Sequence, residues 1–421
     1  MDVFAKRVDF RSFRLAMVLF FIVLLASAAY QTLGQTAPHS VHPQSGSISS
    51  QDQIREIRKL LDEEEKPVPR VSPADPARLF REAYAQIRDM LEGAVPPDLK
   101  RAVFLVENAS RGNRMRYEDF QARIDSVLAF CYAGLAEEGF APEDPMARRL
   151  MLHRLYTDTL RRTDSRSGRL LYHYPFRYDF EDFWGDSDWS RQFVSRLLQT
   201  GAGQCHSMPL LYLILARELG LEAYLAYSPN HSYIRFRDGQ GTWHNFETTN
   251  GHMVSDKWIM GSQYIKTGAI RHRLYMDTLG LRQQLAVCLN DLNNGFQVYF
   301  GIADGRFPDE CSNLSLRHYP QGNLHALATR SNMYLQLFDR LRRQMGVPEE
   351  DEDIARFLES RADARMYWRQ HEKYYDMIRD MGYEDMPPEV YEAWLRSVED
   401  EKEKRQDTGA ARHLQEREVG K

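Results

Sequence analysis

Apolar residues recur three or four positions apart through most of the first half of the chain, which is the spacing of an amphipathic helix. One such stretch, 79–91, follows Asp75-Pro76, a typical helix start, and stops at Gly93. The same periodicity predicts helices at four further places before residue 200: 98–108, 117–137, 145–161 and 189–198. Ahead of the last of these, residues 172–189 are rich in Tyr, Phe and Trp and are predicted to form a loop. The first half of the protein is therefore expected to be mostly helical.

The pattern changes after Gly201. An apolar helix is predicted from Cys205 to Leu219, closed by Gly220. Short aromatic and β-branched runs separated by turn residues then predict three strands, the last two joined by a hairpin: 222–228, 231–236 and 242–248. Beyond residue 262 the helical spacing returns and continues, in helix pairs, to about residue 397. Helices followed by a small sheet and then more helices indicate an α+β fold.

The N-terminus carries a basic segment followed by an uncharged apolar run. Lys6, Arg7, Arg11 and Arg14 precede the run 15–30, which ends in small residues. This order is typical of a secretory signal, and the run is short for a spanning helix, which needs about 20 apolar residues. An uncleaved anchor is the alternative, since the positive charges lie on the side that stays inside. We therefore expect an exported protein, periplasmic or otherwise extracytoplasmic, or one anchored to the membrane by this segment.

Composition and pattern divide the chain into six segments. They are 1–30 (signal peptide or signal anchor), 31–74 (polar linker), 75–190 (N-terminal helical region), 191–261 (the core motifs around Cys205), 262–397 (helical region) and 398–421 (charged tail). The tail opens with seven consecutive charged residues, which is typical of a solvated chain end.

Charge and known motifs exclude several classes of function. The net charge is −5 over 421 residues, and no Lys/Arg block lies outside the N-terminus, so no nucleic-acid partner is expected. The chain has no nucleotide-binding glycine motif and no EF-hand loop, so no cofactor is expected. Its cysteines, at 131, 205, 288 and 311, do not have metal-type spacing. Cys131 and Cys288 lie on apolar helix faces and are expected to be buried small hydrophobic residues.

Cys205 has the sequence context of a reactive thiol. It follows a Gly-Ala-Gly-Gln turn and opens the predicted apolar helix. The free amides and the dipole at a helix N-terminus favour the thiolate, which is the nucleophilic form. The same N–H groups, including that of Cys205, are placed to stabilise an oxyanion. Gln204 is a second oxyanion candidate, although it could equally be a turn residue.

His231 and Glu247 are the candidate partners of this thiol, because a thiol nucleophile requires an imidazole base and the base requires an orienting group. A tight hairpin centred on Gly239 and Gln240 brings them to within one residue of direct opposition. Directly opposed side chains share a face and lie about 5 Å apart at Cβ. A register slip of one residue would put the two on opposite faces.

The segments GQCHSMPLLYLILARELGLEAYLAYSPNHSYIRF and TWHNFETTNG resemble the core of the transglutaminase-like superfamily. That resemblance implies a papain-type α+β fold with a Cys-His-Asp triad, in which Cys205 is the nucleophile and His231 the base. ETTNG stands where the family usually shows Asp-Pro/Leu-Thr-X-Gly, which assigns the acid to Glu247, with Glu in place of Asp. The likeness covers residues 193–251.

The function implied is acyl chemistry on a protein or peptide amide through a thioester: hydrolysis by a peptidase or amidase, or transfer to an amine by a transglutaminase. The alternative is a catalytically weak or inactive transglutaminase-like module that binds proteins through its C-terminal helices. A metal site is a further interpretation, but the spacings match no zinc pattern and no metal is expected. Its ligands would come from Cys205, His206, His231, His244 and His252.

The helical region after residue 262 weakly resembles a tetratricopeptide-type array. Pro320, Asn323 and Ala326 have the cadence of a repeat junction. No clean 34-residue period is present, so an ordinary helical packing region is an equally good interpretation.

Overall fold

The computed structural model describes residues 77–384, except 165–166, 183–184, 186 and 264, and also residue 396. All of the described helices and strands lie in one compact unit of the chain, which ends at Tyr383. Helices and small sheets are mixed, so the α+β class is confirmed. The predicted signal, linker and charged tail lie outside the described residues. None of the described helices is long and apolar enough to cross a membrane.

The helices predicted before residue 160 are present, and their ends follow local chemistry. They are α3 (Arg78–Leu91), α4 (Leu99–Ser110), α5 (Tyr117–Glu137) and α6 (Pro145–Thr157). Asp98 caps α4 by accepting a hydrogen bond from the Arg101 amide, and Asp144 caps α6 ahead of a proline at the first helical position. The expected helix 145–161 ends four residues early, because Leu160 begins a strand.

The described part of the segment 172–189, which was predicted to be a loop, is mostly irregular, but it contains the end of one short strand and all of another. β1 (Leu160–Thr163) pairs antiparallel with β2 (Leu170–His173), and β3 (Arg177–Tyr178) pairs parallel with β4 (Ala202–Gly203). The helix expected over 189–198 is divided into a 3-10 turn, η1 (Trp189–Gln192), and α7 (Val194–Thr200). Pairs this short depend on where the partner chain runs, which periodicity does not record.

The centre of the protein is helix α8 (Ser207–Glu218) packed on a four-stranded antiparallel sheet. The strands follow chain order: β5 (Tyr224–Ser228), β6 (His231–Arg237), β7 (Trp243–Glu247) and β8 (His252–Val254). The first three were predicted and β8 was not. Asn230, at φ 55°, makes the tight turn that brings His231 to the start of β6.

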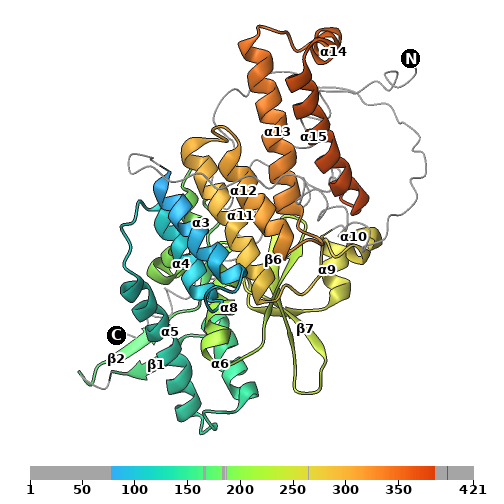
Figure 1. The fold of residues 1–421 in the computed structure, drawn as a ribbon. Coiled ribbons are helices and arrows are strands. Elements are labelled where there is room, and N and C mark those ends of the chain that lie inside the picture. Colours follow the sequence, from blue (N-terminus) through green and yellow to red (C-terminus); the bar gives the residue numbers. More distant parts are fainter. Residues whose placement is uncertain are drawn as a thin grey trace. The chain divides into compact units, whose positions relative to one another are not determined.

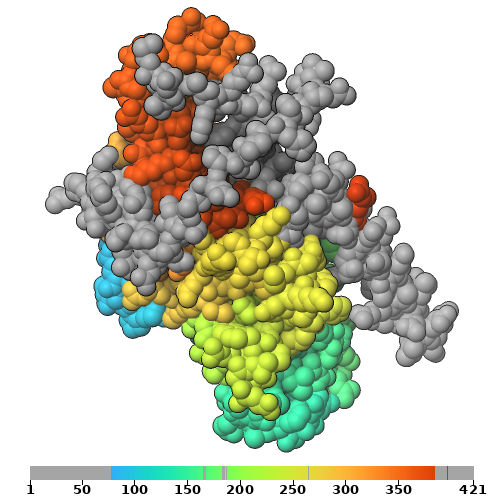
Figure 2. All heavy atoms as spheres, turned by 90° about the vertical axis from the view of Figure 1, so that its right-hand side faces the viewer, coloured from blue at the N-terminus to red at the C-terminus, as the bar shows by residue number. Residues whose placement is uncertain are grey.

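Seven helices follow the sheet in the part of the chain up to residue 384 that the structure describes. They are α9 (Asp256–Ser262), α10 (Thr267–Arg271), α11 (Leu281–Phe300), α12 (Arg306–His318), α13 (Leu324–Gln344), α14 (Asp351–Ser360) and α15 (Ala362–Asp380). In Figure 1, α11 and α12 lie beside α3 and α4, while α13 pairs with α15. Asn323 caps α13 through the Ala326 amide, so the predicted repeat junction is a helix–helix connection. Figure 2 views the side of α9 and α10, whose yellow surface adjoins the yellow-green strands.

One hydrophobic core joins parts that the sequence pattern separates. It runs from Ala77 to Tyr319 and includes residues of α3, α4, α8 and α11. The two faces of the sheet are buried differently: Leu225 and Ile234 belong to this core, whereas Ala226 and Tyr233 pack in a second cluster with residues of α9, α13 and α15. The helices on both sides of residues 191–261 are therefore packed directly against the segment that carries Cys205.

Candidate active site

A short loop held by backbone bonds presents Cys205. Gly201, at φ 70°, ends α7 in the left-handed conformation that glycine adopts most readily. Ala202 and Gly203 then pair with β3. Gly203 lies so close to its surroundings that a Cβ there would be 2.8 Å from Ser207 Oγ and 3.1 Å from Leu197 Cδ1. Glycine is therefore required at this position by packing.

Helix α8 begins at Ser207, two residues later than predicted, with His206 as its N-cap. Cys205 lies in the turn just before the cap rather than in the helix itself. The turn is already helical in its bonding, because the Met208 amide donates to the Gln204 carbonyl at 3.0 Å. Cys205 is partly exposed, while the helix behind it is buried. The thiol thus remains at the positive end of the helix, as the sequence suggested.

Gln204 is fully buried, and its side-chain amide makes structural hydrogen bonds. Its Nε2 donates to the backbone carbonyls of Asp179 at 2.9 Å and Asp182 at 3.2 Å. These two bonds use both of its N–H groups. The side chain therefore holds the 179–182 segment against the loop that carries Cys205. Of the two oxyanion candidates, the backbone N–H of Cys205 is the one that remains.

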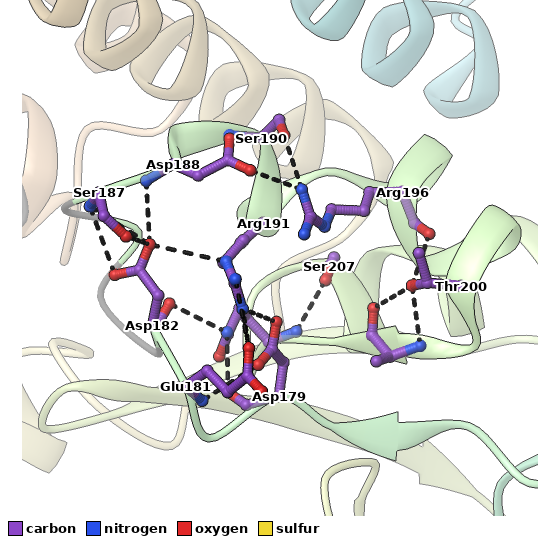
Figure 3. A network of polar contacts seen from close by, with 12 residues as sticks. Asp179, Glu181, Asp182, Ser187, Asp188, Ser190, Arg191, Arg196, Thr200 and Ser207 are labelled. Carbon is purple, nitrogen blue, oxygen red and sulfur yellow. Dashed lines mark hydrogen bonds and ion pairs between the residues drawn. The ribbon is translucent and has the colours of Figure 1, made fainter.

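A polar network braces the other side of this loop (Figure 3). Arg191 forms ion pairs with Asp179 at 2.7 Å and with Asp182 at 3.8 Å. Asp182 also accepts hydrogen bonds from the backbone amides of Ser187 and Asp188. The segment that Gln204 holds is thus itself anchored to the residues preceding α7.

His231 and Glu247 are in direct contact: Nε2 of the imidazole lies 2.6 Å from Oε2 of the carboxylate. The observed hairpin pairs Ile234 with Phe246, and one further pair sets Glu247 opposite Tyr233. The expected near-direct opposition is therefore wrong. The two residues are diagonal neighbours on one face of the sheet, where backbones lie about 7–8 Å apart, so a long side chain is needed to close the distance. The extra methylene of Glu, compared with Asp, fits this geometry.

The thiol and the imidazole shift one another's pKa. Burial by itself would raise the pKa of Cys205, but a hydrogen bond with His231 and the positive charges of His231 and His206 hold it below its ordinary value. Burial would lower the pKa of His231, but the Glu247 carboxylate and hydrogen bonds with Cys205 and Glu247 raise it well above its ordinary value. The Ser232 hydroxyl also donates to the Cys205 carbonyl, which ties the loop to β6. The arrangement favours a thiolate–imidazolium pair.

The other cysteines have the opposite properties. Cys131, Cys288 and Cys311 are buried, as expected for the first two, and all four thiols are free. Burial raises the pKa of Cys131 to about 12 and the pKa of Cys288 and Cys311 well above the ordinary range. Cys205 is therefore the one thiol among the four whose surroundings favour the nucleophilic form.

A second imidazole–carboxylate pair lies next to the nucleophile, and sequence reasoning missed it. His206 Nε2 lies 3.2 Å from Oδ2 of Asp291, which is on α11. Nearby, Glu107 of α4 is buried and accepts hydrogen bonds from the Val194 and Ser195 amides at the start of α7. Burial raises the pKa of Glu107 to about 7 despite these bonds. The available signal was only that His206 follows Cys205, because its partner comes from a distant helix.

Glu107, His206 and Asp291 line a small pocket, which Cys205 itself does not line. Its walls combine apolar and polar side chains: Val103, Val106, Glu107, Trp189, Gln192, Phe193, His206, Leu210, Cys288 and Asp291. The pocket is a candidate position for a substrate side chain.

Of the residues suggested as metal ligands, His206 and His231 lie beside Cys205. His244 is paired with Asp238 at 2.8 Å in the β6–β7 hairpin, and His252 is exposed on β8. Among the described residues, no group of three or more His, Cys, Asp or Glu side chains is placed to hold a metal ion.

No family model, no curated protein and no solved structure matches this chain. The function of the protein is therefore inferred from the geometry and chemistry of the site itself.

Proposed function

We propose that the protein is a cysteine-dependent enzyme that acts on amide or peptide bonds, with Cys205 as nucleophile, His231 as base and Glu247 as the group that orients the imidazole. The observation that carries the proposal is the 2.6 Å contact between His231 and Glu247. The same imidazole also lowers the pKa of the Cys205 thiol. Three side chains linked in this order are the arrangement that thiol catalysis requires. The resemblance to the transglutaminase-like superfamily supports the same roles.

In the proposed reaction the Cys205 thiolate attacks the carbonyl carbon of the amide. The oxyanion is placed to accept hydrogen bonds from the free amides at the start of α8, including that of Cys205. The C–N bond then breaks, and the His231 imidazolium gives its proton to the leaving amine. A thioester remains. Water, or a second amine, next gives a proton to His231 and attacks the thioester, which releases the acid or the new amide and restores the thiolate.

The hydrogen bond between His231 Nε2 and Glu247 has a direct role in the proposed reaction. Because Nε2 is bonded to the carboxylate, Nδ1 is the ring nitrogen left to exchange a proton with the thiol and the amine. The carboxylate also supports the positive charge that the ring carries before the leaving amine takes its proton.

Selective alkylation tests the proposal. We expect limiting iodoacetamide near pH 7 to label Cys205 before the other three cysteines, as read by peptide mass spectrometry. The His231→Gln variant should label more slowly. A glutamine-containing peptide, offered with and without a primary amine, then separates hydrolysis from amine incorporation, since ammonia is released in both. Equal labelling of all four cysteines in the native protein would contradict the assignment of the nucleophile.

The alternative is a module that binds proteins through its C-terminal helices without turnover, for which the Glu in place of Asp is the specific observation. It predicts that the Cys205→Ala variant keeps the binding properties of the protein. The enzyme hypothesis predicts that this variant loses turnover.

A further inference from the structure

We propose that His206, paired with Asp291 of α11, is a positioning residue for the same reaction, holding a positive charge beside the Cys205 thiolate in the wall of the substrate pocket. This inference rests on the proposed function of Cys205. It adds a second imidazole–carboxylate pair to the site, separate from His231 and Glu247.

His206 lies next to the nucleophile in the chain, and its ring is paired with a carboxylate. His206 is the residue directly after the nucleophile and is the N-cap of α8. Its ring is bonded to Asp291 at 3.2 Å, so it is fixed by a helix from the C-terminal half of the chain. The side chains of His206 and Asp291 are 28% and 16% exposed, which places the pair at the pocket wall rather than in bulk solvent. A charge in such a partly buried position is screened less than a surface charge.

Several charged and titratable groups interact with the His206 ring. They come from three helices and the adjoining loop: Glu107 of α4, Cys205, Asp291 of α11 and His325 of α13. Tyr227 of β5 interacts with Asp291 and Cys205. Burial would lower the pKa of His206, but the charge and hydrogen bond of Asp291 raise it overall. Burial lowers the pKa of His325, and the Asp291 carboxylate opposes that shift.

The consequence for the nucleophile is direct. The positive charge of His206 is one of the influences that hold the pKa of Cys205 below its ordinary value. Two imidazolium groups then offset the burial of the thiolate and the repulsion by Glu247. The α11 helix, which sequence analysis placed in a separate region, supplies the carboxylate that keeps one of these rings charged.

The experiment measures the rate of Cys205 alkylation by iodoacetamide from pH 5 to pH 9 on the full chain, in wild type and in His206→Gln. The midpoint of the curve should move up by about one pH unit in the variant, because a charge that stabilises the thiolate is lost. His244→Gln is the matched control. It removes a histidine that is also paired with an aspartate, at 2.8 Å, but in the β6–β7 hairpin. Its curve should equal that of wild type.

Asp291→Asn is the second variant and keeps the test decisive if His206→Gln folds poorly. Without the carboxylate, the His206 ring loses its proton at lower pH. The variant should therefore alkylate like wild type near pH 5 and like His206→Gln near pH 8. A purely structural role would not produce this pH-dependent crossover.

A charged reagent gives an independent measurement. At pH 6 the ratio of iodoacetate to iodoacetamide rates should fall by about two- to threefold in His206→Gln, since a positive charge attracts the anionic reagent. The proposal is overturned if the His206→Gln and His244→Gln curves coincide, or if Asp291→Asn matches wild type at every pH. Failure of the proposed function would appear differently, as a His231→Gln curve identical to that of wild type.

Discussion

At the residue scale, the length of the acid is matched to the register of the hairpin. Glu247 and His231 are diagonal neighbours rather than direct partners, and the 2.6 Å contact between them requires the reach of a glutamate. Asn245, the nearest amide on the same strand, is bonded to Val254 and Asp256 instead. In the proposed mechanism the orienting role therefore falls to Glu247.

Replacing Glu247 tests this match. Glu247→Gln should lower turnover by up to about 10⁴, because an orienting carboxylate is removed with its shape retained. The melting temperature should change little. Glu247→Asp should be partly impaired, since the shorter side chain does not span the diagonal. Full activity in Glu247→Gln would mean that the carboxylate is structural, and full activity in Glu247→Asp would mean that the strand adjusts.

Gly203 controls how closely the nucleophile loop approaches α7 and α8. In Gly203→Ala the new methyl group would meet Ser207 Oγ at 2.8 Å, so the loop must shift. We expect a loss of about 1–3 kcal/mol in the free energy of unfolding and slower alkylation of Cys205. Gly239→Ala is the control, since a Cβ there meets nothing within 4 Å and its φ is not left-handed. Equal effects of the two substitutions would show that packing at Gly203 is unimportant.

At the scale of elements, α7 is held by a carboxylate from another helix. Glu107 of α4 bonds the first two amides of α7 at 2.7 and 2.9 Å, which takes the place of a local N-cap. The element that precedes the nucleophile loop is therefore oriented by the N-terminal helices.

Glu107→Ala should destabilise the protein by about 2–3 kcal/mol at pH 5, because two buried amides lose their partner. The pKa of Glu107 is raised to about 7 in the folded state from an ordinary 4.5, so the native state binds the extra proton. The contribution of Glu107 to the free energy of unfolding is therefore fully present below pH 4.5, and it is lost as the pH rises through about 7. The difference in free energy of unfolding between wild type and variant should be smaller at pH 8 than at pH 5, as measured by chemical denaturation.

Glu118→Ala, at an exposed position of α5, is the control. Its free energy of unfolding should lie within about 0.5 kcal/mol of the wild-type value.

At the scale of the whole molecule, the helices after the sheet are part of the site. Asp291 of α11 and His325 of α13 both face His206, and α11 packs on α3 and α4 in the main core. The region that resembles a helical appendage in the sequence thus contributes both stability and charge to the nucleophile. The tetratricopeptide-like array around Asn323 remains a prediction, whereas the capping of α13 by Asn323 is observed.

Export is the prediction that concerns the chain as a whole. The basic and apolar residues at its start precede every described element. A fusion of residues 1–60 to a reporter that works only outside the cytoplasm should be active, because the charge order directs the following chain outward. The same fusion with residues 15–30 deleted is the control. A reporter signal that is absent in both would contradict export.

Local signals in the sequence predict the order and kind of the main elements and the candidate nucleophile, base and acid. Helical periodicity, the glycines around Cys205 and the hairpin turn are local signals, and they act over a few residues. Tertiary structure decided what local signals do not contain: the short strands β1–β4, the true register at Glu247 and the use of Gln204 as a brace. It also decided the pairing of His206 with Asp291 and the capping of α7 by Glu107. Each of these depends on which distant segments pack together, and burial of a shared core, rather than propensity, selects that packing.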